Sequence, residues 1–306
     1  MFCGIGPVPN RENHIVLSPS KLAKFIECPS IYEWEYIKGN RETTPAMEQG
    51  TMIHEFILEP EVFASKYAFT PDLPDYSAND LKAICKEKGL KVSGTKAELI
   101  SSIKAVDESF DCLDLWTQAN SHRQIVSPKQ KLMLETLKER LEKSDLYTKV
   151  IGPAQKEQLM YYTHLETGIV LPFKCDVVLK TDKMLAILDI KTTNDIAEYK
   201  FDRDNYAMCR DVQAAAYKQG IEQIYQRRVN AFAWLALETS APYRFDQIAP
   251  DDAMMEGGEA RLNYYMREFK QRFEANDWSP RKVGKGIRQT SLMAWNWEEI
   301  NSLENN

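Results

Sequence analysis

The sequence predicts a mixed α/β (α+β) fold, in which a central sheet is flanked by helices and carries a small helical insertion. Apolar residues three and four positions apart predict amphipathic helices toward both ends of the chain. Strand-like runs separated by short polar turns occupy the middle. A lysine-rich segment with two short helical patterns lies between linkers rich in proline and aspartate, which predicts an inserted unit.

Composition limits the class of protein. The 306 residues suffice for one large domain or two modest ones with a sizeable core. Hydrophobic content of 43% and charged content of 27% exclude a disordered, collagen-like or coiled-coil chain. The net charge of −6 excludes a uniformly basic nucleic-acid coat, so any DNA contact must be local. Six cysteines without a C-x-x-C motif argue against structural zinc and a dense disulfide framework, and favour a reducing compartment.

Neither a signal peptide nor a membrane span is predicted from the sequence. Residues 1–14 lack the basic and apolar segments of a signal peptide. The longest apolar run, residues 231–237, is far too short to cross a bilayer. We therefore expect a cytoplasmic protein with no membrane partner.

Five stretches have the periodicity of helices. The first follows Ser18-Pro19 and is expected to break at Pro29, and the second contains His54 and ends at Glu59-Pro60. The predicted helices are residues 21–38, 45–58, 128–143, 211–226 and 258–275.

Strand-like runs follow in the middle of the chain. Short polar turns between them predict an antiparallel meander. The runs are residues 158–163, 169–173, 175–180 and 184–190, with a later strand at 229–237.

The stretch 175–193, CDVVLKTDKMLAILDIKTT, holds the most informative polar residues. If its two strands turn at residues 182 and 183, paired residue numbers sum to 365, which puts Asp176 opposite Asp189. Lys191 follows two residues later on the same face. Two carboxylates this close repel each other, and a hard divalent cation such as Mg²⁺ is the simplest compensation, with the carbonyl of Ile190 as a further ligand. An isolated D-x-K is more often a surface ion pair, but here apolar residues flank both acids.

A metal and a lysine in this arrangement suit phosphodiester hydrolysis, because the metal polarises the phosphate and the ammonium stabilises developing charge. Gln213 and Tyr217, four residues apart on one helix face, could line the same cleft. His54 could supply an imidazole ligand, although a lone helical histidine is more often a surface or core-edge residue.

In chain order these motifs read G-T-x-x-H, D, D-I-K-T-T and Q-x-x-x-Y, and they resemble the PD-(D/E)xK nuclease superfamily in its RecB-like branch. The closer resemblance is to the RecE-type (exonuclease VIII-like) phage recombination exonucleases, and it covers residues 18 to about 237. The segments that carry it are GTMIHEFILEPEVF, CDVV, LAILDIKTT and FDRDNYAMCRDVQAAAYKQGI. The resemblance implies a restriction-endonuclease-like core with a mixed sheet. It also implies His54, Asp176 and Asp189 as metal ligands, Lys191 as the catalytic lysine, and Gln213 and Tyr217 as accessory cleft residues. Glu157 matches an acidic position of the family, and could equally be a surface charge.

The same resemblance implies a function. Such enzymes are Mg²⁺-dependent, with Mn²⁺ as a substitute, and degrade double-stranded DNA ends from 5′ to 3′. The resulting 3′ overhang serves a RecT-like annealing partner, and the enzymes form rings of three or four subunits in a bacterial cytoplasm, encoded by a phage or prophage. The alternatives are a RecB-like nuclease of other polarity, an endonuclease, or a non-catalytic duplex-binding protein that kept the fold.

The predicted insertion, residues 75–105, divides the nuclease domain into residues 1–70 and 108–306. It resembles a SAP module through Leu81, Lys82, Gly89, Leu90, Gly94, Lys96 and Leu99. SAP modules bind duplex DNA largely through phosphate contacts. The candidate DNA-binding residues are Lys82, Lys86, Lys88, Lys91 and Lys96. The alternative is a helical hairpin that braces the nuclease.

A second basic run lies near the end of the chain and is followed by Trp295 and Trp297. Basic and aromatic residues interleaved in this way suit a single strand held by charge and stacking, although an ordinary terminus also looks like this. The candidate residues are Arg281, Lys282, Lys285 and Arg288.

Overall fold

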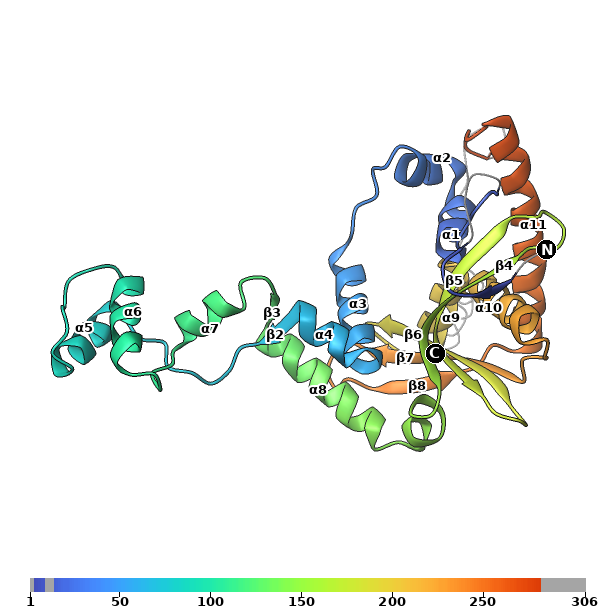
Figure 1. Ribbon diagram of the computed structural model, residues 1–306. Helices are drawn as coiled ribbons and strands as arrows, with labels where there is room; N and C mark the ends of the chain where they lie inside the picture. The colour runs from blue at the N-terminus through green and yellow to red at the C-terminus, as the bar shows by residue number, and fades with distance from the viewer. Residues whose placement is uncertain (1–2, 9–13, 282–306) are drawn as a thin grey trace, which may run out of the picture.

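The computed structural model describes residues 3–8 and 14–281, and has a six-stranded sheet at its centre with helices on both faces (Figure 1). The strand order is β1-β4-β5-β6-β7-β8. The strands are β1 (Gly4–Ile5), β4 (Gln155–Thr163), β5 (Val170–Lys180), β6 (Leu185–Thr193), β7 (Ala231–Glu238) and β8 (Phe245–Ile248).

The sheet is mixed, as predicted. β4, β5 and β6 form the expected antiparallel meander, and β7 runs parallel to β6. The chain crosses from β6 to β7 through α9 (Glu198–Ala207) and α10 (Arg210–Tyr225). The runs predicted at 169–173 and 175–180 are one strand, β5, because Lys174 continues the ladder opposite Leu159. The sequence patterns did not predict the edge strands β1 and β8 or helix α9.

One face of the sheet is covered by α1 (Pro19–Glu27), α10 and α11 (Asp252–Ala275). The break predicted at Pro29 is confirmed, because α1 ends at Glu27 and a second short helix, α2 (Pro29–Tyr32), follows. An aromatic cluster holds the helices together, with the rings of Phe25 and Phe269 5.1 Å apart. The helix predicted at 258–275 is α11, which begins earlier, at Asp252.

The opposite face is covered by α3 (Pro45–Leu58), α4 (Pro60–Lys66) and α8 (Pro128–Glu142). The bounds of α3 are those that the sequence predicts. The Thr44 hydroxyl caps it by accepting a hydrogen bond from the Met47 amide at 3.3 Å, and Pro60 follows its end. Buried Met52 and Ile53 on α3 pack with Ile190 of β6 in one core. This packing holds α3 against the sheet and so places His54.

A separate helical unit projects from this body (Figure 1). The chain leaves through β2 (Tyr67–Phe69) and returns through β3 (Gln124–Val126), and these two strands pair in parallel at the base of the unit. Its helices are α5 (Ala78–Glu87), α6 (Lys96–Val106) and α7 (Leu113–Ala119). Its own small core joins Leu81 and Leu99 to Phe110. The unit therefore includes residues beyond 105, since Phe110 completes its core.

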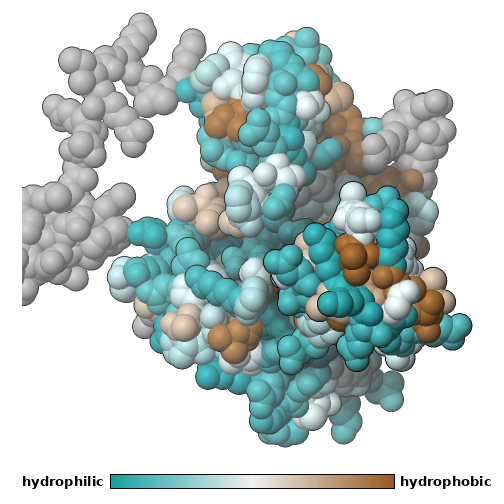
Figure 2. Space-filling view, turned by 90° about the vertical axis from the view of Figure 1, so that its left-hand side faces the viewer, coloured by the Kyte–Doolittle hydropathy of each residue, from teal (hydrophilic) through white to brown (hydrophobic). Residues whose placement is uncertain are grey.

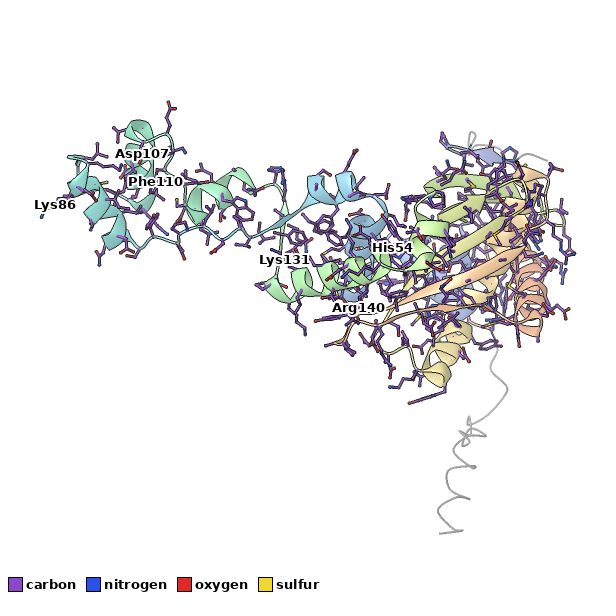
Figure 3. The ribbon with its side chains drawn as sticks, turned by 90° about the horizontal axis from the view of Figure 1, so that it is seen from below. His54, Lys86, Asp107, Phe110, Lys131 and Arg140 are labelled. Atoms are coloured by element: carbon purple, nitrogen blue, oxygen red, sulfur yellow. The ribbon has the colours of Figure 1, made fainter. Side chains whose placement is uncertain are left out.

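The face of the molecule that carries this unit is mostly hydrophilic, with apolar side chains in small scattered patches (Figure 2). Lys86 lies at the far end of the unit and His54 lies in the body (Figure 3). None of the helices in residues 3–8 and 14–281 is long and apolar enough to cross a membrane.

Substitutions at two adjacent glycines of α11 can test how closely α10 packs on α11. A Cβ at buried Gly258 would lie 2.5 Å from the Asp211 carbonyl oxygen, whereas a Cβ at exposed Gly257 would meet nothing within 4 Å. Gly258→Ala should therefore lower the free energy of unfolding by about 1–3 kcal/mol. Gly257→Ala should raise it by about 0.5–1 kcal/mol, because alanine favours the helix. Denaturant unfolding measures both, and equal effects would contradict this packing.

Candidate metal centre and cleft

Three acids lie in a row across neighbouring strands. In the β4–β5 ladder, the residue pairs directly before and after this position place Glu157 of β4 opposite Asp176 of β5. The β5–β6 ladder has the register predicted from the sequence, and its last pair, Val177 with Leu188, stands one step from Asp176 and Asp189. Asp176 and Asp189 are 7% and 2% exposed, so both carboxyls are removed from solvent.

The position of Asp176 depends on where β5 and β6 separate. Their ladder ends at Val177 and Leu188, and beyond it the Oδ2 atom of Asp176 accepts a hydrogen bond from the Ile190 amide at 2.5 Å. The carboxylate thus satisfies a backbone donor that the ladder no longer pairs. This bond fixes Asp176 beside Ile190 and leaves its second oxygen free to face α3.

That second oxygen belongs to a cluster of possible metal donors. Asp176 Oδ1 lies 3.5 Å from His54 Nδ1, and Glu157 Oε1 lies 3.7 Å from the same nitrogen. Ligand atoms of His54, Glu157 and Asp176 all lie within 4.8 Å of one another. Glu157 Oε1 is buried and has no hydrogen-bond partner among the described residues. An unsatisfied carboxylate oxygen facing another acid fits a cation ligand.

Glu157 is held in an uncommon backbone conformation. Its φ is 52°, in the left-handed region that side chains other than glycine rarely adopt. Such strain costs about 1–3 kcal/mol and concentrates at functional sites. Its second oxygen, Oε2, pairs with Lys174 Nζ at 2.5 Å, and Lys174 also contacts Glu59 at 3.2 Å.

The charges of the cluster shift one another's pKa values. Burial opposes the charged form of His54, but the carboxylates of Asp176 and Glu157 outweigh it and raise the pKa of His54 to about 10. Burial likewise opposes the charge of Asp176, yet His54 and Lys191 lower its pKa. A metal-ligating imidazole must be neutral, so a bound cation would replace the His54 proton as the positive partner of these acids.

Asp189 and Lys191 form an ion pair next to this cluster. Burial raises the pKa of Asp189, Lys191 opposes the shift, and the charge of Asp176 adds to it. Because Asp189 is 2% exposed, this is not a surface ion pair. The Lys191 side chain is partly accessible and lines a cleft.

Gln213 and Tyr217 act on the backbone behind the cluster. The Gln213 amide donates to the Tyr217 hydroxyl at 2.9 Å, and that hydroxyl donates to the Lys174 carbonyl at 3.2 Å. The pair therefore holds β5 two residues before Asp176. Their contact with a substrate remains a prediction.

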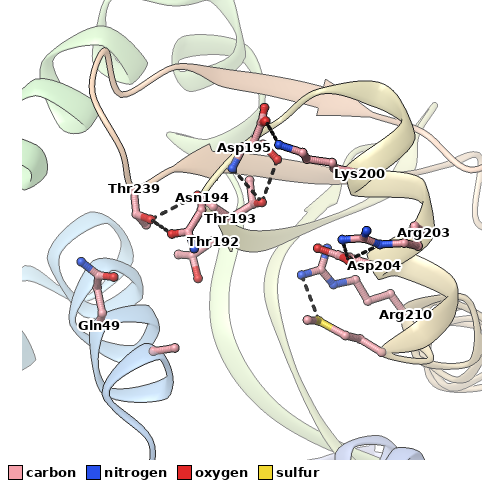
Figure 4. Close-up of a pocket in the computed structure, with 12 residues that line it drawn as sticks. Gln49, Thr192, Thr193, Asn194, Asp195, Lys200, Arg203, Asp204, Arg210 and Thr239 are labelled. Carbon is pink, nitrogen blue, oxygen red and sulfur yellow. Dashed lines mark hydrogen bonds and ion pairs between the residues drawn. The ribbon is translucent and has the colours of Figure 1, made fainter.

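Two adjoining clefts open beside these residues. A cleft of about 410 Å³ is lined by His54, Glu157, Lys174, Ile190 and Lys191, among others. A neighbouring cleft of about 350 Å³ runs between α3, the end of β6 and α9 (Figure 4). Thr192 and Arg210 line both. The sequence patterns singled out neither Lys174 nor Arg210, because only the tertiary fold brings them to the clefts.

The predicted basic residues have different surroundings. Lys82, Lys86 and Lys91 of the helical unit are exposed. Lys88 pairs with Asp107 at 2.8 Å, and Lys96 pairs with Asp114 at 2.7 Å. These two would have to exchange an ion pair for a phosphate.

Arg281 anchors the end of the described chain. Its guanidinium binds Glu268 at 3.0 Å and the Phe25 and Ile26 carbonyls at 3.1 and 2.8 Å. Contact with DNA would have to compete with these bonds. Lys282, Lys285 and Arg288, with Trp295 and Trp297, lie outside the described residues.

Known proteins and a protein family resemble this chain in fold or in sequence. A crystal structure of a "putative exonuclease" from Eubacterium rectale has a similar fold, with a TM-score of 0.55 and 13% identity, over 95% of this chain and 98% of that one. A second structure, of a protein designated SSO0001, aligns with a TM-score of 0.28 and 12% identity, over 79% of this chain and 95% of that one. No curated protein sequence matches the chain. The family model of a PDDEXK-like domain of unknown function (DUF3799) matches residues 18–285. The chain therefore belongs to this PDDEXK-like family.

Proposed function

We propose that the protein is a divalent-metal-dependent exodeoxyribonuclease that acts on the ends of double-stranded DNA. The observation that carries this proposal is the cluster of His54, Glu157 and Asp176 beside the buried Asp189–Lys191 pair in an open cleft. Membership of a PDDEXK-like family supports a nuclease. The fold shared with the Eubacterium rectale protein is consistent with it.

The residues divide into those that would hold the metal and those that would act on the substrate. Asp176, Glu157 and His54 would bind the cation, with Asp189 and the Ile190 carbonyl as further ligands. The bound cation would act as a Lewis acid on the phosphate and make the attacking water more acidic. Lys191 would orient that water or stabilise the charge that develops on the phosphate. Asp189 holds the Lys191 ammonium in place through its ion pair.

The finer features of the proposal come from the sequence resemblance to RecE-type exonucleases. They are 5′ to 3′ degradation, a 3′ overhang passed to a RecT-like annealing partner, and a ring of three or four subunits. We further propose a role in phage-type recombination in a bacterial cytoplasm. An endonuclease, a nuclease of other polarity and a non-catalytic DNA-binding protein are the alternative outcomes of the test below.

We propose Mg²⁺ as the cofactor, with Mn²⁺ as a substitute. The three proposed carboxylates, those of Glu157, Asp176 and Asp189, provide the hard oxygen ligands that Mg²⁺ prefers. The imidazole of His54 suits Mn²⁺ better than Mg²⁺, since affinity for nitrogen donors rises along the transition series.

Metal binding can be measured without catalysis. Mn²⁺ at 100 times its Kd should stabilise the wild-type protein by about 2.7 kcal/mol, which raises the unfolding midpoint by about 4 °C for a chain of this length. In Asp176→Asn this shift should be largely lost, while the asparagine oxygen can still accept the Ile190 hydrogen bond. Glu166→Gln is the matched control, because Glu166 is an exposed acid paired with Arg267. A full shift in Asp176→Asn would remove this residue from the metal centre.

Digestion of linear duplex DNA labelled at either end, with and without Mg²⁺, tests the activity. Metal-dependent release of the 5′ label with a closed circular control untouched is the expected result. Nicking of the circle would favour an endonuclease, and binding without cutting would leave a non-catalytic protein. Lys191→Ala and Asp189→Ala should each slow cleavage by at least about 100-fold.

Lys183→Ala is the control for these two variants, since Lys183 is an exposed lysine in the turn of the same hairpin. It should cleave at the wild-type rate. Thermal unfolding of each variant separates loss of chemistry from loss of fold. Full activity in Lys191→Ala would reject the proposed catalytic lysine.

We also propose that the helical unit is a SAP-like grip on duplex DNA. Exposed Lys82, Lys86 and Lys91 provide positive charge without an ion pair within the described ranges. The hydrophilic surface on this side suits phosphate contact (Figure 2).

Replacing Lys82, Lys86 and Lys91 together by Gln tests this grip. Duplex affinity should fall, and the slope of its logarithm against the logarithm of salt concentration should shrink by up to about three. The matched control replaces Lys129, Lys143 and Lys149, which are exposed on the body, so the net charge changes equally. Equal losses of duplex affinity in the two triple variants would mean that the helical unit supports the nuclease domain and does not bind DNA.

A further inference from the structure

Most buried charges in the described chain have an opposite charge beside them. Buried Asp211 pairs with Arg261 at 2.6 Å, and buried Glu238 pairs with Arg244 at 2.6 Å. Arg210 is 8% exposed and departs from this pattern. Among the side chains that the structure describes, no carboxylate oxygen lies within ion-pair distance of its guanidinium, and Asp189 and Asp204 act on its charge only from farther away. A buried charge without a partner is costly unless something else compensates it.

Neutral groups fix the orientation of Arg210 instead. Its Nη1 donates to the Asn205 amide oxygen at 3.1 Å, and Nη2 contacts the Met208 sulfur at 3.6 Å. The guanidinium lies 5.2 Å from the centre of the Phe201 ring. Asn205 is fully buried, and its Nδ2 has no hydrogen-bond partner among the described residues, so its side chain contacts Arg210 through Oδ1. An asparagine holds the guanidinium in place but leaves its positive charge uncancelled.

Arg210 also lies where the two clefts meet. It lines both the cleft of the metal donors and the neighbouring one, opposite Gln49 of α3 and beside Thr192 of β6 (Figure 4). It is the first residue of the 16-residue helix α10, whose amino terminus adds partial positive charge. Lys200 and Arg203 line the second cleft too, but they pair with Asp195 and Asp204. Arg210 is thus a cation at the junction that has no ion pair among the described side chains.

We propose that Arg210 binds a phosphate of the nucleic-acid strand at this junction, next to the phosphate that is cut. This inference rests on the proposed nuclease function and adds a substrate-binding residue to it. A guanidinium donates two parallel hydrogen bonds to a phosphate, and Asn205 presents it in one orientation. The phosphate would form the ion pair that Arg210 lacks among the described side chains. The second cleft then carries the strand past the end of β6 and along α9.

The test uses binding of the whole protein to a duplex oligonucleotide in Ca²⁺ instead of Mg²⁺, with intact DNA verified on a gel. Phosphates near the end are replaced one at a time by neutral methylphosphonates. In the wild type, one position besides the scissile phosphate should weaken binding by about 10- to 100-fold, as expected for hydrogen bonds to a charged group. In Arg210→Gln, binding to unmodified DNA should fall by a similar factor, and the sensitivity at that one position should disappear.

Two further variants separate a phosphate contact from a structural role. Asn205→Asp keeps a hydrogen-bond acceptor but neutralises Arg210, so it should reproduce the loss of binding and of positional sensitivity. Arg210→Lys keeps the charge and should restore part of the affinity. Arg267→Gln is the matched control, because Arg267 is an exposed arginine whose side chain pairs with Glu166. It should leave the whole profile unchanged.

The source of the phosphate is distinguished by DNA with a 5′-phosphate or a 5′-hydroxyl end. An Arg210→Gln effect confined to 5′-phosphorylated DNA identifies a terminal phosphate, and an effect with both identifies an internal phosphodiester. A positional profile that is the same in Arg210→Gln and wild type would overturn the proposal, as would equal weakening at every position. Failure of the wild type to cut in Mg²⁺ would instead overturn the nuclease function, and the binding profile would still be readable.

Discussion

The separation of β5 from β6 after Val177 and Leu188 is the constraint on which the rest of the site depends. A ladder that continued would pair the Ile190 amide with backbone. Because it ends, the amide is satisfied by the Asp176 carboxylate, which is thereby held inside the sheet with one oxygen directed toward α3. Burial by itself would drive such a carboxyl to take up a proton. The positive charges around it keep it ionised, so the backbone geometry and the charge balance require each other.

That charge balance explains why residues from distant parts of the chain meet here. Glu157, Asp176 and Asp189 bring three negative charges onto adjacent strands, and His54, Lys174 and Lys191 face them. α3 can deliver His54 only because its apolar residues are buried against Ile190 and the rest of that core. The Gln213–Tyr217 pair on the other side holds the Lys174 carbonyl. Helices on both faces of the sheet therefore hold the part of β5 that carries Lys174 and Asp176 in a fixed position.

The part of this arrangement that follows from local sequence was predictable. The β5–β6 register follows from a short turn between two apolar strands, and the α3 bounds follow from Thr44, Pro60 and an apolar repeat. Helix α9 was missed because it is largely polar, with Phe201 and Asn205 buried four residues apart in place of an apolar stripe. The strand β8 is four residues long at the sheet edge and has too few positions to show a period.

No local pattern predicted the remaining residues, because tertiary structure gives them their role; the family resemblance alone named Glu157, and nothing named Lys174. Glu157 is one acid among many in the sequence, and what distinguishes it is a left-handed backbone and a buried oxygen without a partner. Lys174 interrupts an apolar strand and resembles a solvated lysine until Glu59 and Glu157 are placed beside it. No local pattern marks these two positions. The sequence motifs therefore identified Asp176, Asp189 and Lys191, and they did not identify these two neighbouring residues.

Acids and bases line both clefts, and a phosphodiester strand can use the two in sequence. The first concentrates carboxylates, which would repel a nucleic acid unless a cation is bound between them. The second contains Lys200, Arg203 and Arg210, and the charge of Arg210 is held by an amide that does not neutralise it. A strand that enters along the second cleft would meet Arg210 at the point where the metal donors begin. Cation and guanidinium would then share one chain of phosphates, which gives a physical reason for an arginine without an ion pair to be buried near Asp189.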